Sequence, residues 1–324
     1  MSDASVRSTA FSAFSGLIRQ KRFWPYLAAV FVYLVISRIS GNAEATLAAS
    51  MSFASFFILV GIGQMLVITT GPGNIDLSIP YTIALAGLIA MKTMNEVNAN
   101  ILMGFAAGIA AGAVIGVVNY ILIRLILMPP MIATLSSSFI VRTLSIVFFR
   151  GLQIKPPTAL ARFANAKIAG APVIFLIVLC VAALMAAVLA RSRYGRSIHA
   201  IGQNMRAAWL SNISVMRVKL LTYMLCGIFA AATGVLLSGF IGGATLDMGD
   251  EYMMYSIAVV VLGGSSIAGG DSNVSGIVGA SLFLYLLVNL LNIMGLGISL
   301  RNIITGLIII AIIFIGGERA SKKS

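Results

Sequence analysis

The sequence predicts an all-α, polytopic integral membrane protein: a helical bundle of about ten transmembrane helices, with re-entrant or broken segments and no soluble domain. Hydrophobic residues make up 60% of the 324 residues, whereas charged residues make up only 10%, far below the roughly 25% of a globular chain. Apolar segments follow one another along the chain. No polar stretch between them is long enough to fold separately.

The predicted helices are the runs of apolar residues, because about 18 such residues suffice to span a bilayer. Runs of this length occupy 47–70, 101–123, 173–190, 220–240 and 274–294. The run 23–37 is somewhat short, and 303–315 is short but almost wholly apolar. Weaker segments lie at 79–91, 131–149 and 253–262.

Glycines recur at four-residue steps in GFAAGIAAGAVIGVV (104–118). Small residues at this spacing let helix backbones approach closely in a membrane. We therefore interpret the repeat as a packing surface, with a pore-lining role as the alternative.

Positive charge sets the predicted orientation, because Lys and Arg are enriched in cytoplasmic loops. Ten crossings place the basic regions 1–22, 191–219 and 317–324 on one side, the cytoplasm. We thus expect a cytoplasmic arm (1–22), a transmembrane domain (23–316) that contains the segment 191–219, and a cytoplasmic tail (317–324). The basic loop 150–170 disagrees, since the helix count places it outside.

The net charge of +13 does not indicate nucleic-acid binding. The basic residues lie between hydrophobic segments and are not interleaved with aromatic residues on one polar face, as nucleic-acid recognition requires. We expect membrane lipid around the chain and no nucleic acid.

The stretch TTGPGNIDLSIP (69–80) breaks a predicted helix, with Pro72 and Pro80 on either side of Asp76. Non-helical backbone at membrane depth is tolerated only where protein or a water-filled cavity surrounds it. The Asp76 carboxylate can cap the next helix by accepting its first free N–H groups. The alternative is a role in a permeation path or gate.

A second break lies in VLGGSSIAGGDSNVSGIVGA (261–280). Gly264 and Gly269 have the first spacing of a phosphate-binding loop, but Gly270 and Asp271 stand where Lys and Ser or Thr are required. This is therefore not a nucleotide site. We expect a re-entrant loop or a hinge on the cytoplasmic side, with hinge residues Gly263, Gly264, Gly269 and Gly270.

No catalytic or metal-binding pattern is found in the sequence. The single histidine, His199, has no partner at metal-ligand spacing and completes no Ser-His-Asp set. We expect no catalytic residues, metal or cofactor on this chain. Arg142, predicted within a helix, is a functional candidate by default, although a snorkelling side chain or a helix end explains it equally well.

The segment GRSIHAIGQNMRAAWLSNI (195–213) is basic and half polar. Its apolar residues recur in steps of three or four, at Ile198, Ile201, Met205, Trp209 and Ile213, which predicts an amphipathic helix. Such a helix can lie on lipid headgroups or dock into a groove of a partner protein. Composition leaves both possibilities open.

The same segment resembles the cytoplasmic segment of ribose-type sugar permeases of bacterial ABC importers, in which G-R-x-x-x-A-I-G-x-N-x-x-A-A-x-x-S-G-I recurs. Asn212 replaces a usual Gly. NIDLSIP (74–80) resembles the family's G-G-I-D-L-S-V-G, and VVLGGSSIAGG (260–270) resembles V-[VI]-[IL]-G-G-T-S-x-x-G-G. The three motifs occur in the family's order, and the resemblance covers roughly residues 47–316.

The resemblance implies a permease subunit that pairs with a second copy, or with a related permease in a heterodimer. A cytoplasmic ABC ATPase would bind below and a periplasmic sugar-binding protein above, in a bacterial inner membrane with both termini cytoplasmic. ATP and Mg would bind the partner ATPase. The coupling helix of the family falls within 195–213, which assigns coupling to Gly195, Arg196, Ala200, Gly202, Asn204, Arg206, Ala207 and Ala208.

The leading hypothesis is an importer for a monosaccharide or related polyol, moved by alternating access that the partner ATPase drives. Neutral sugars need hydroxyl-compatible partners. The candidates for the translocation path or gate are Gln64, Asp76, Ser78, Asn119, Ser136, Ser137 and Asn289, although hydrogen bonds that stabilise the bundle explain such residues equally well.

An ion-coupled secondary transporter is the alternative, and it would need inverted halves and several buried carboxylates. Asp76 is nearly the only carboxylate expected to be buried in the membrane. A membrane-embedded enzyme would need a cluster of His, Asp or Glu near one interface.

Overall fold

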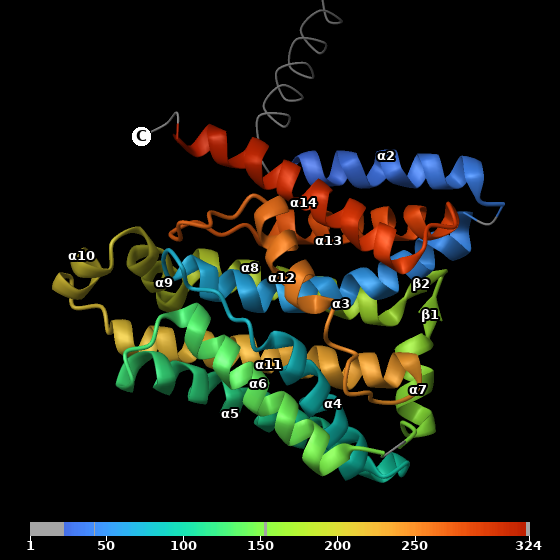
Figure 1. Ribbon diagram of the computed structural model, residues 1–324, viewed down its shortest axis with the longest axis horizontal. Coiled ribbons are helices and arrows are strands. Elements are labelled where there is room, and N and C mark those ends of the chain that lie inside the picture. Colours follow the sequence, from blue (N-terminus) through green and yellow to red (C-terminus); the bar gives the residue numbers. More distant parts are fainter. Residues whose placement is uncertain (1–22, 42, 152–153, 322–324) are drawn as a thin grey trace, which may run out of the picture.

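The computed structural model describes residues 23–41, 43–151 and 154–321, and α-helices dominate it (Figure 1). The helices are α2 (Phe23–Ile39), α3 (Ala43–Thr69), α4 (Ile79–Met94), α5 (Ile101–Leu125), α6 (Pro130–Phe149), α7 (Thr158–Asn165), α8 (Val173–Arg191), α9 (Arg193–Gln203), α10 (Met205–Leu210), α11 (Val215–Ile241), α12 (Tyr252–Leu262), α13 (Val274–Ile293) and α14 (Ile298–Ser321). A 3-10 helix, η1 (Asn98–Asn100), and a two-residue antiparallel pair, β1 (Lys167–Ile168) and β2 (Ala171–Pro172), complete the described chain. The predicted all-α fold is confirmed.

The described helices agree with the predicted number of about ten apolar segments. Six are long and apolar enough to cross a membrane: α3, α5 with η1, α6, α8, α11 and α13. The helices α2, α4 and α12 are apolar but shorter, and α14 is the tenth apolar helix. Because α14 continues to Ser321, the expected boundary at 316 falls inside it. The predicted arm 1–22 lies outside the described residues.

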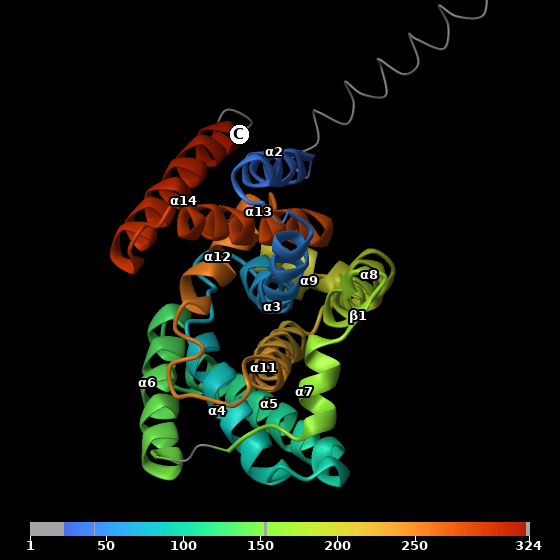
Figure 2. The ribbon, with the colours of Figure 1, turned by 90° about the vertical axis from the view of Figure 1, so that its right-hand side faces the viewer.

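Helix α3 lies in the middle of the bundle (Figure 2). It packs against α8, α11, α12 and α13, with α2 and α14 on one side of these and α4, α5 and α6 on the other. Within its most apolar 18-residue window, 89% of the residues are buried. A helix that is apolar all round is expected to be buried on every side, and α3 meets this expectation.

The glycine repeat of α5 packs against neighbouring backbones. A Cβ atom on Gly112 would overlap the carbonyl oxygen of Gly227 in α11, and one on Gly227 would overlap the carbonyl oxygen of Gly112. One turn further on, a Cβ on Gly116 would overlap the carbonyl of Tyr223. The repeat is therefore a packing surface, as predicted.

The basic loop 150–170 and the segment 191–219 lie at opposite ends of the bundle (Figure 1). At the loop end, Asn98 of η1 hydrogen-bonds Thr158 and the Ala159 N–H at the start of α7. Asn165 of α7 donates to the carbonyl of Phe240 near the end of α11. This arrangement agrees with the helix count, which places the loop on the opposite side from the 191–219 segment, although the loop is positively charged.

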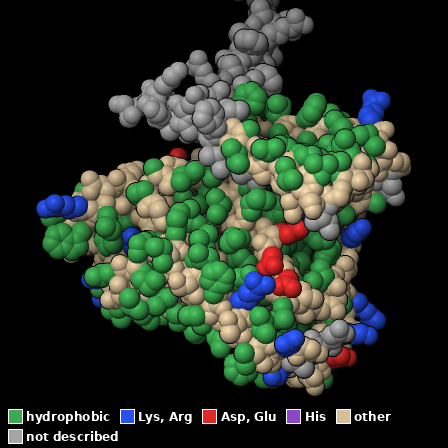
Figure 3. Space-filling model, viewed as in Figure 1, with side chains coloured by type: hydrophobic (Ala, Val, Ile, Leu, Met, Phe, Trp, Pro, Cys, Tyr) green, Lys and Arg blue, Asp and Glu red, His purple; other side chains and the backbone are tan. Residues whose placement is uncertain are grey.

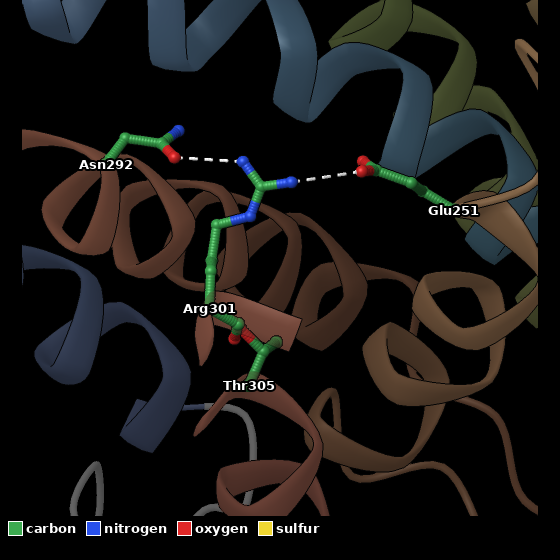
Figure 4. A network of polar contacts seen from close by, with 4 residues as sticks. All are labelled: Glu251, Asn292, Arg301 and Thr305. Atoms are coloured by element: carbon green, nitrogen blue, oxygen red, sulfur yellow. Dashed lines mark hydrogen bonds and ion pairs between the residues drawn. The ribbon is translucent and has the colours of Figure 1, made fainter. Parts of the chain in front are cut away.

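Arg301 of α14 joins three helices (Figure 4). Its guanidinium donates to Asn292 Oδ1 of α13 at 2.9 Å and to Glu251 Oε1, just before α12, at 3.2 Å. The side chain is only 14% exposed, and the Thr305 hydroxyl donates to the Arg301 carbonyl. A partly buried, paired arginine of this kind fixes α12, α13 and α14 relative to one another.

We expect Gly227→Val to destabilise the bundle, because its new methyl groups would meet the backbone of Gly112. Overpacking of this kind costs about 1–3 kcal/mol. The thermal unfolding temperature of the detergent-solubilised chain should fall. Gly306→Val on α14 is the control, because a Cβ there meets no atom within 4 Å. Equal losses for the two variants would contradict the packing argument.

Candidate functional site

The chain leaves α3 at Thr69 and returns into the bundle before α4 begins. Gly71 and Gly73 have positive φ values of 133° and 74°, which turn the backbone in a way that favours glycine. The segment that follows is non-helical, and its Asp76 and Ser78 are 2% and 1% exposed. The predicted broken segment is therefore present and surrounded by protein.

Five of the predicted path residues come together around this segment. The Asp76 N–H donates to Gln64 Oε1 of α3 at 3.2 Å. Asp76 Oδ1 accepts from the Ser78 N–H at 2.9 Å and from its hydroxyl at 2.6 Å. Asn119 of α5 donates to Ser78 Oγ at 2.8 Å and to Asp76 Oδ1 at 3.3 Å. Ser137 of α6 donates to Asn119 Oδ1. We call these five residues and Thr134 the Asp76 cluster.

Thr134 of α6 is a member that the sequence reasoning missed. Its hydroxyl oxygen accepts from the Leu77 N–H at 3.0 Å and lies 3.1 Å from the Ile75 carbonyl oxygen, to which the hydroxyl can donate. Gln64 and Thr134 thus satisfy the backbone of the segment in place of water. The sequence could have indicated Thr134, because it precedes the candidate Ser137 by three residues and so lies on the same face of a helix.

Asp76 does not cap α4, contrary to expectation. Ser78 is the N-cap residue of α4, and the helix begins without a side-chain cap. Asp76 stands two residues earlier and bonds Ser78 and Asn119. Its carboxylate therefore organises the segment before the helix rather than the first turn of the helix.

Two predicted path residues lie outside the cluster. Ser136 is half-buried on α6, beside the buried Ser137 that does belong to it. Asn289 of α13 donates to Ser50 Oγ of α3 at 3.3 Å. Ser50 lies about 20 Å along α3 from Gln64, so Asn289 links helices elsewhere in the bundle.

The predicted amphipathic helix of 195–213 is in fact two short helices, α9 and α10. Asn204 between them is extended, and its side chain accepts from the Ala207 N–H at 3.0 Å. Asn is a favoured N-cap residue, so it ends one helix and starts the next. Of the predicted apolar face, Ile198 is buried, whereas Trp209 is 65% exposed.

Three backbones meet at the end of α9. The Gly270 N–H donates to the carbonyl oxygen of Thr69, the last residue of α3, at 3.0 Å. A Cβ on Gly202 of α9 would overlap that carbonyl oxygen and the Gly270 nitrogen. We call Thr69, Gly202 and Gly270 the glycine junction. It brings a predicted coupling residue and a predicted hinge residue together with the start of the broken segment.

His199 makes a second link between α9 and the loop 263–273. Its Nδ1 lies 2.6 Å from the Gly195 carbonyl oxygen, and its Nε2 lies 2.8 Å from Ser272 Oγ. A carbonyl oxygen can only accept, so Nδ1 carries the proton. In the neutral ring, Nε2 then accepts from the Ser272 hydroxyl.

Some of the remaining predicted coupling residues contact neighbouring helices, whereas others are exposed. Gly195 packs on the backbone of Leu189 in α8, and the Arg196 guanidinium donates to the Arg191 carbonyl at 3.0 Å. Ala200 is half-buried and Ala208 buried, whereas Asn204, Arg206 and Ala207 are exposed. Arg196 is exposed as well, and the other exposed residues lie at and beyond the break.

The other predicted hinge residues lie in the loop between α12 and α13. Gly264 and Gly269 have φ values of 83° and 87°, which favour glycine. A Cβ on Gly263 would lie 2.8 Å from the backbone of Gly276 in α13. The loop is therefore built from tight turns and a close helix contact.

Arg142 of α6 pairs near the end of the bundle that carries α7. Its guanidinium lies 3.6 Å from Asp247 and 5.1 Å from the centre of the Tyr81 ring. Burial and the Asp247 carboxylate raise the pKa of the neighbouring Asp250. Figure 3 shows acidic side chains gathered on a largely hydrophobic face. Exposed pairs of this kind contribute little stability. Arg142 lies inside α6, which continues to Phe149, so the helix-end interpretation is wrong, and its partly exposed side chain fits the snorkelling interpretation.

Comparison with known proteins gives one family. The family described as "Branched-chain amino acid transport system / permease component" matches residues 46–313. The ribose import permease protein of Escherichia coli strain K12 is 31% identical over 267 residues, 81% of this chain and 82% of the relative. The autoinducer 2 import system permease protein of Photorhabdus temperata is 29% identical over 309 residues, 91% and 92% of the two chains.

A third relative is the D-allose transport system permease protein of Escherichia coli strain K12. It is 27% identical over 297 residues, 89% of this chain and 90% of the relative. No solved structure matches the chain.

We expect Asp76→Ala to lower the unfolding temperature of the detergent-solubilised chain. It leaves the N–H and the hydroxyl of Ser78 without their acceptor and removes the weaker acceptor of Asn119, and each unsatisfied buried group costs roughly 1–3 kcal/mol. Asp76→Asn keeps one oxygen and should lose less. Ser136→Ala, outside the cluster, should stay within about 0.5 kcal/mol of the parent chain. An unchanged unfolding temperature for Asp76→Ala would show that the cluster does not hold the segment.

Proposed function

Because the chain belongs to the family of branched-chain amino acid transport system permease components, we propose that it is the membrane-spanning permease subunit of an ATP-binding-cassette importer. The cargo is a monosaccharide or related polyol. Two relatives named for ribose and D-allose, each aligned over four-fifths or more of both chains, support a sugar as the substrate class. The motifs of 195–213, 74–80 and 260–270 support the same assignment.

The working assembly contains two permease subunits, either two copies of this chain or one copy with a related permease. A cytoplasmic ATPase binds ATP and Mg, and a periplasmic sugar-binding protein delivers the cargo. The chain crosses the bacterial inner membrane with both termini in the cytoplasm, which the basic segment 191–219 supports.

The glycine junction is the observation that carries the mechanism. An ATPase that moves α9 and α10 displaces Gly202, which abuts Thr69 of α3 and Gly270 of the following loop. The displacement thereby reaches the two breaks in the helical bundle. ATP binding biases the subunit toward one of its two access states only if the ATPase binds the two states with different affinity.

The ion-coupled alternative receives less support. Among the described residues, Asp76 is the one acidic side chain that is buried, and its carboxylate is already bonded to Ser78 and Asn119. Ion-coupled carriers use unwound backbone and several polar ligands at their ion sites. The bonds of Asp76 favour a structural role instead.

Reconstitution tests the proposal. The chain is co-expressed with its partner ABC ATPase and sugar-binding protein, purified and placed in vesicles. We expect uptake of radiolabelled ribose or a related sugar that requires ATP and both partners. Sugar accumulation by vesicles that contain this chain alone and an ion gradient would contradict the importer.

We further expect Gly202→Ala to reduce ATP-driven uptake while leaving membrane insertion and ATPase co-purification intact. The added Cβ would push α9 away from Thr69, and a strain of about 1–3 kcal/mol corresponds to a loss of about fivefold to 150-fold. Gly297→Ala is the control, because a Cβ there meets no atom within 4 Å. Undiminished uptake by Gly202→Ala would rule out the junction as the coupling route.

A further inference from the structure

A cavity of about 750 Å³ opens at the end of the bundle that carries α9 and α10. It lies between the last turns of α5, the helix α10 and the first turns of α11. Four basic residues, Arg124, Arg206, Arg217 and Lys219, line it together with the aromatic rings of Tyr120 and Trp209. None of the lining residues is acidic. We call this cavity the basic groove.

The cations of the basic groove have no counter-ion within the described chain. The two ion pairs found there, Arg142 with Asp247 and Arg301 with Glu251, involve none of them. Like charges around one hollow repel one another, and a low-dielectric wall strengthens the field that they create. The groove therefore attracts an anion.

The start of α11 adds to this field. Ser214, which lines the groove, makes no side-chain cap to the helix. The first free N–H groups of a helix carry partial positive charge and bind phosphate readily. These N–H groups therefore add to the attraction that the four cations exert on an anion.

An exposed apolar surface lies beside the groove. At the end of α5, Leu125 is 74% exposed, and Ile126, the next residue, is 60% exposed. On the other wall, Met205 and Trp209 are 53% and 65% exposed, and Trp is enriched at membrane–water interfaces. A ligand that joins an anionic headgroup to apolar chains would use both the groove and this surface.

We propose that the basic groove binds the phosphate headgroup of an anionic phospholipid from the surrounding bilayer, with the acyl chains along the outer face of α5. Basic pockets between transmembrane helices are known to hold such headgroups. The hollow favours a headgroup over the surface of a partner protein, because its volume falls within the roughly 300–1,000 Å³ of small-molecule sites. The proposal does not rest on the transport function.

Lipid retention by the purified full chain, without ATPase or sugar, tests the proposal. The chain is placed in nanodiscs of phosphatidylcholine and phosphatidylglycerol, and co-purified lipid is counted by native mass spectrometry. We expect preferential retention of phosphatidylglycerol. The double variant Arg124→Gln, Lys219→Gln should lower this preference about 25-fold, because each cation contributes about fivefold.

Two further variants separate a site from general charge and from misfolding. Arg150→Gln, Arg162→Gln removes two exposed cations at the opposite end and should keep the preference. The charge-conserving Arg124→Lys, Lys219→Arg should keep it as well. Loss of preference in either variant would overturn the proposal.

Competition identifies the occupant. Inorganic phosphate that displaces phosphatidylglycerol at equal concentration would overturn the lipid assignment in favour of a free anion. Displacement by the purified ATPase would overturn it in favour of a protein partner. Retention of phosphatidylglycerol in both experiments is the expected result.

Discussion

The extended segment between α3 and α4 can remain inside the bundle only because side chains of three helices satisfy its polar groups. In a membrane interior without water, each unsatisfied backbone group costs several kcal/mol. Gln64 and Thr134 bond the backbone, and Asn119 bonds Asp76 and Ser78. The same bonds fix α3, α5 and α6 around the break, so the arrangement of the helices and the path of the loop depend on each other.

The two ends of the bundle are built by different physical means. At the α7 end, the largely buried Arg301 ties α14 to Asn292 of α13 and to Glu251 before α12. At the α9 end, backbones touch at Gly202, Thr69 and Gly270, and the cations have no acidic partner in the described chain. One end is therefore held by charge within the chain, whereas the other end presents charge to its surroundings.

The sequence predicted the number and nature of the helices, since apolar runs report membrane crossings directly. It also grouped Gln64, Asp76, Ser78 and Asn119 as polar candidates, but it could not show that they touch, because they are brought together by the chain's return beside α3. Local pattern alone could not assign Asn289 to a contact with Ser50. The break at Asn204 was missed because hydrophobic periodicity outweighed the capping preference of Asn.

The glycine junction has a mechanical consequence. Side-chain contacts absorb small displacements by rotating between rotamers, but Gly202 and Gly270 have no side chains to rotate, and Thr69 contributes only its carbonyl oxygen. Movement of α9 toward α3 therefore displaces Thr69 and Gly270 directly, because no side chain between these backbones can rotate to absorb it. For the same reason, a substitution at Gly202 has no neighbouring side chain whose rearrangement could restore the fit.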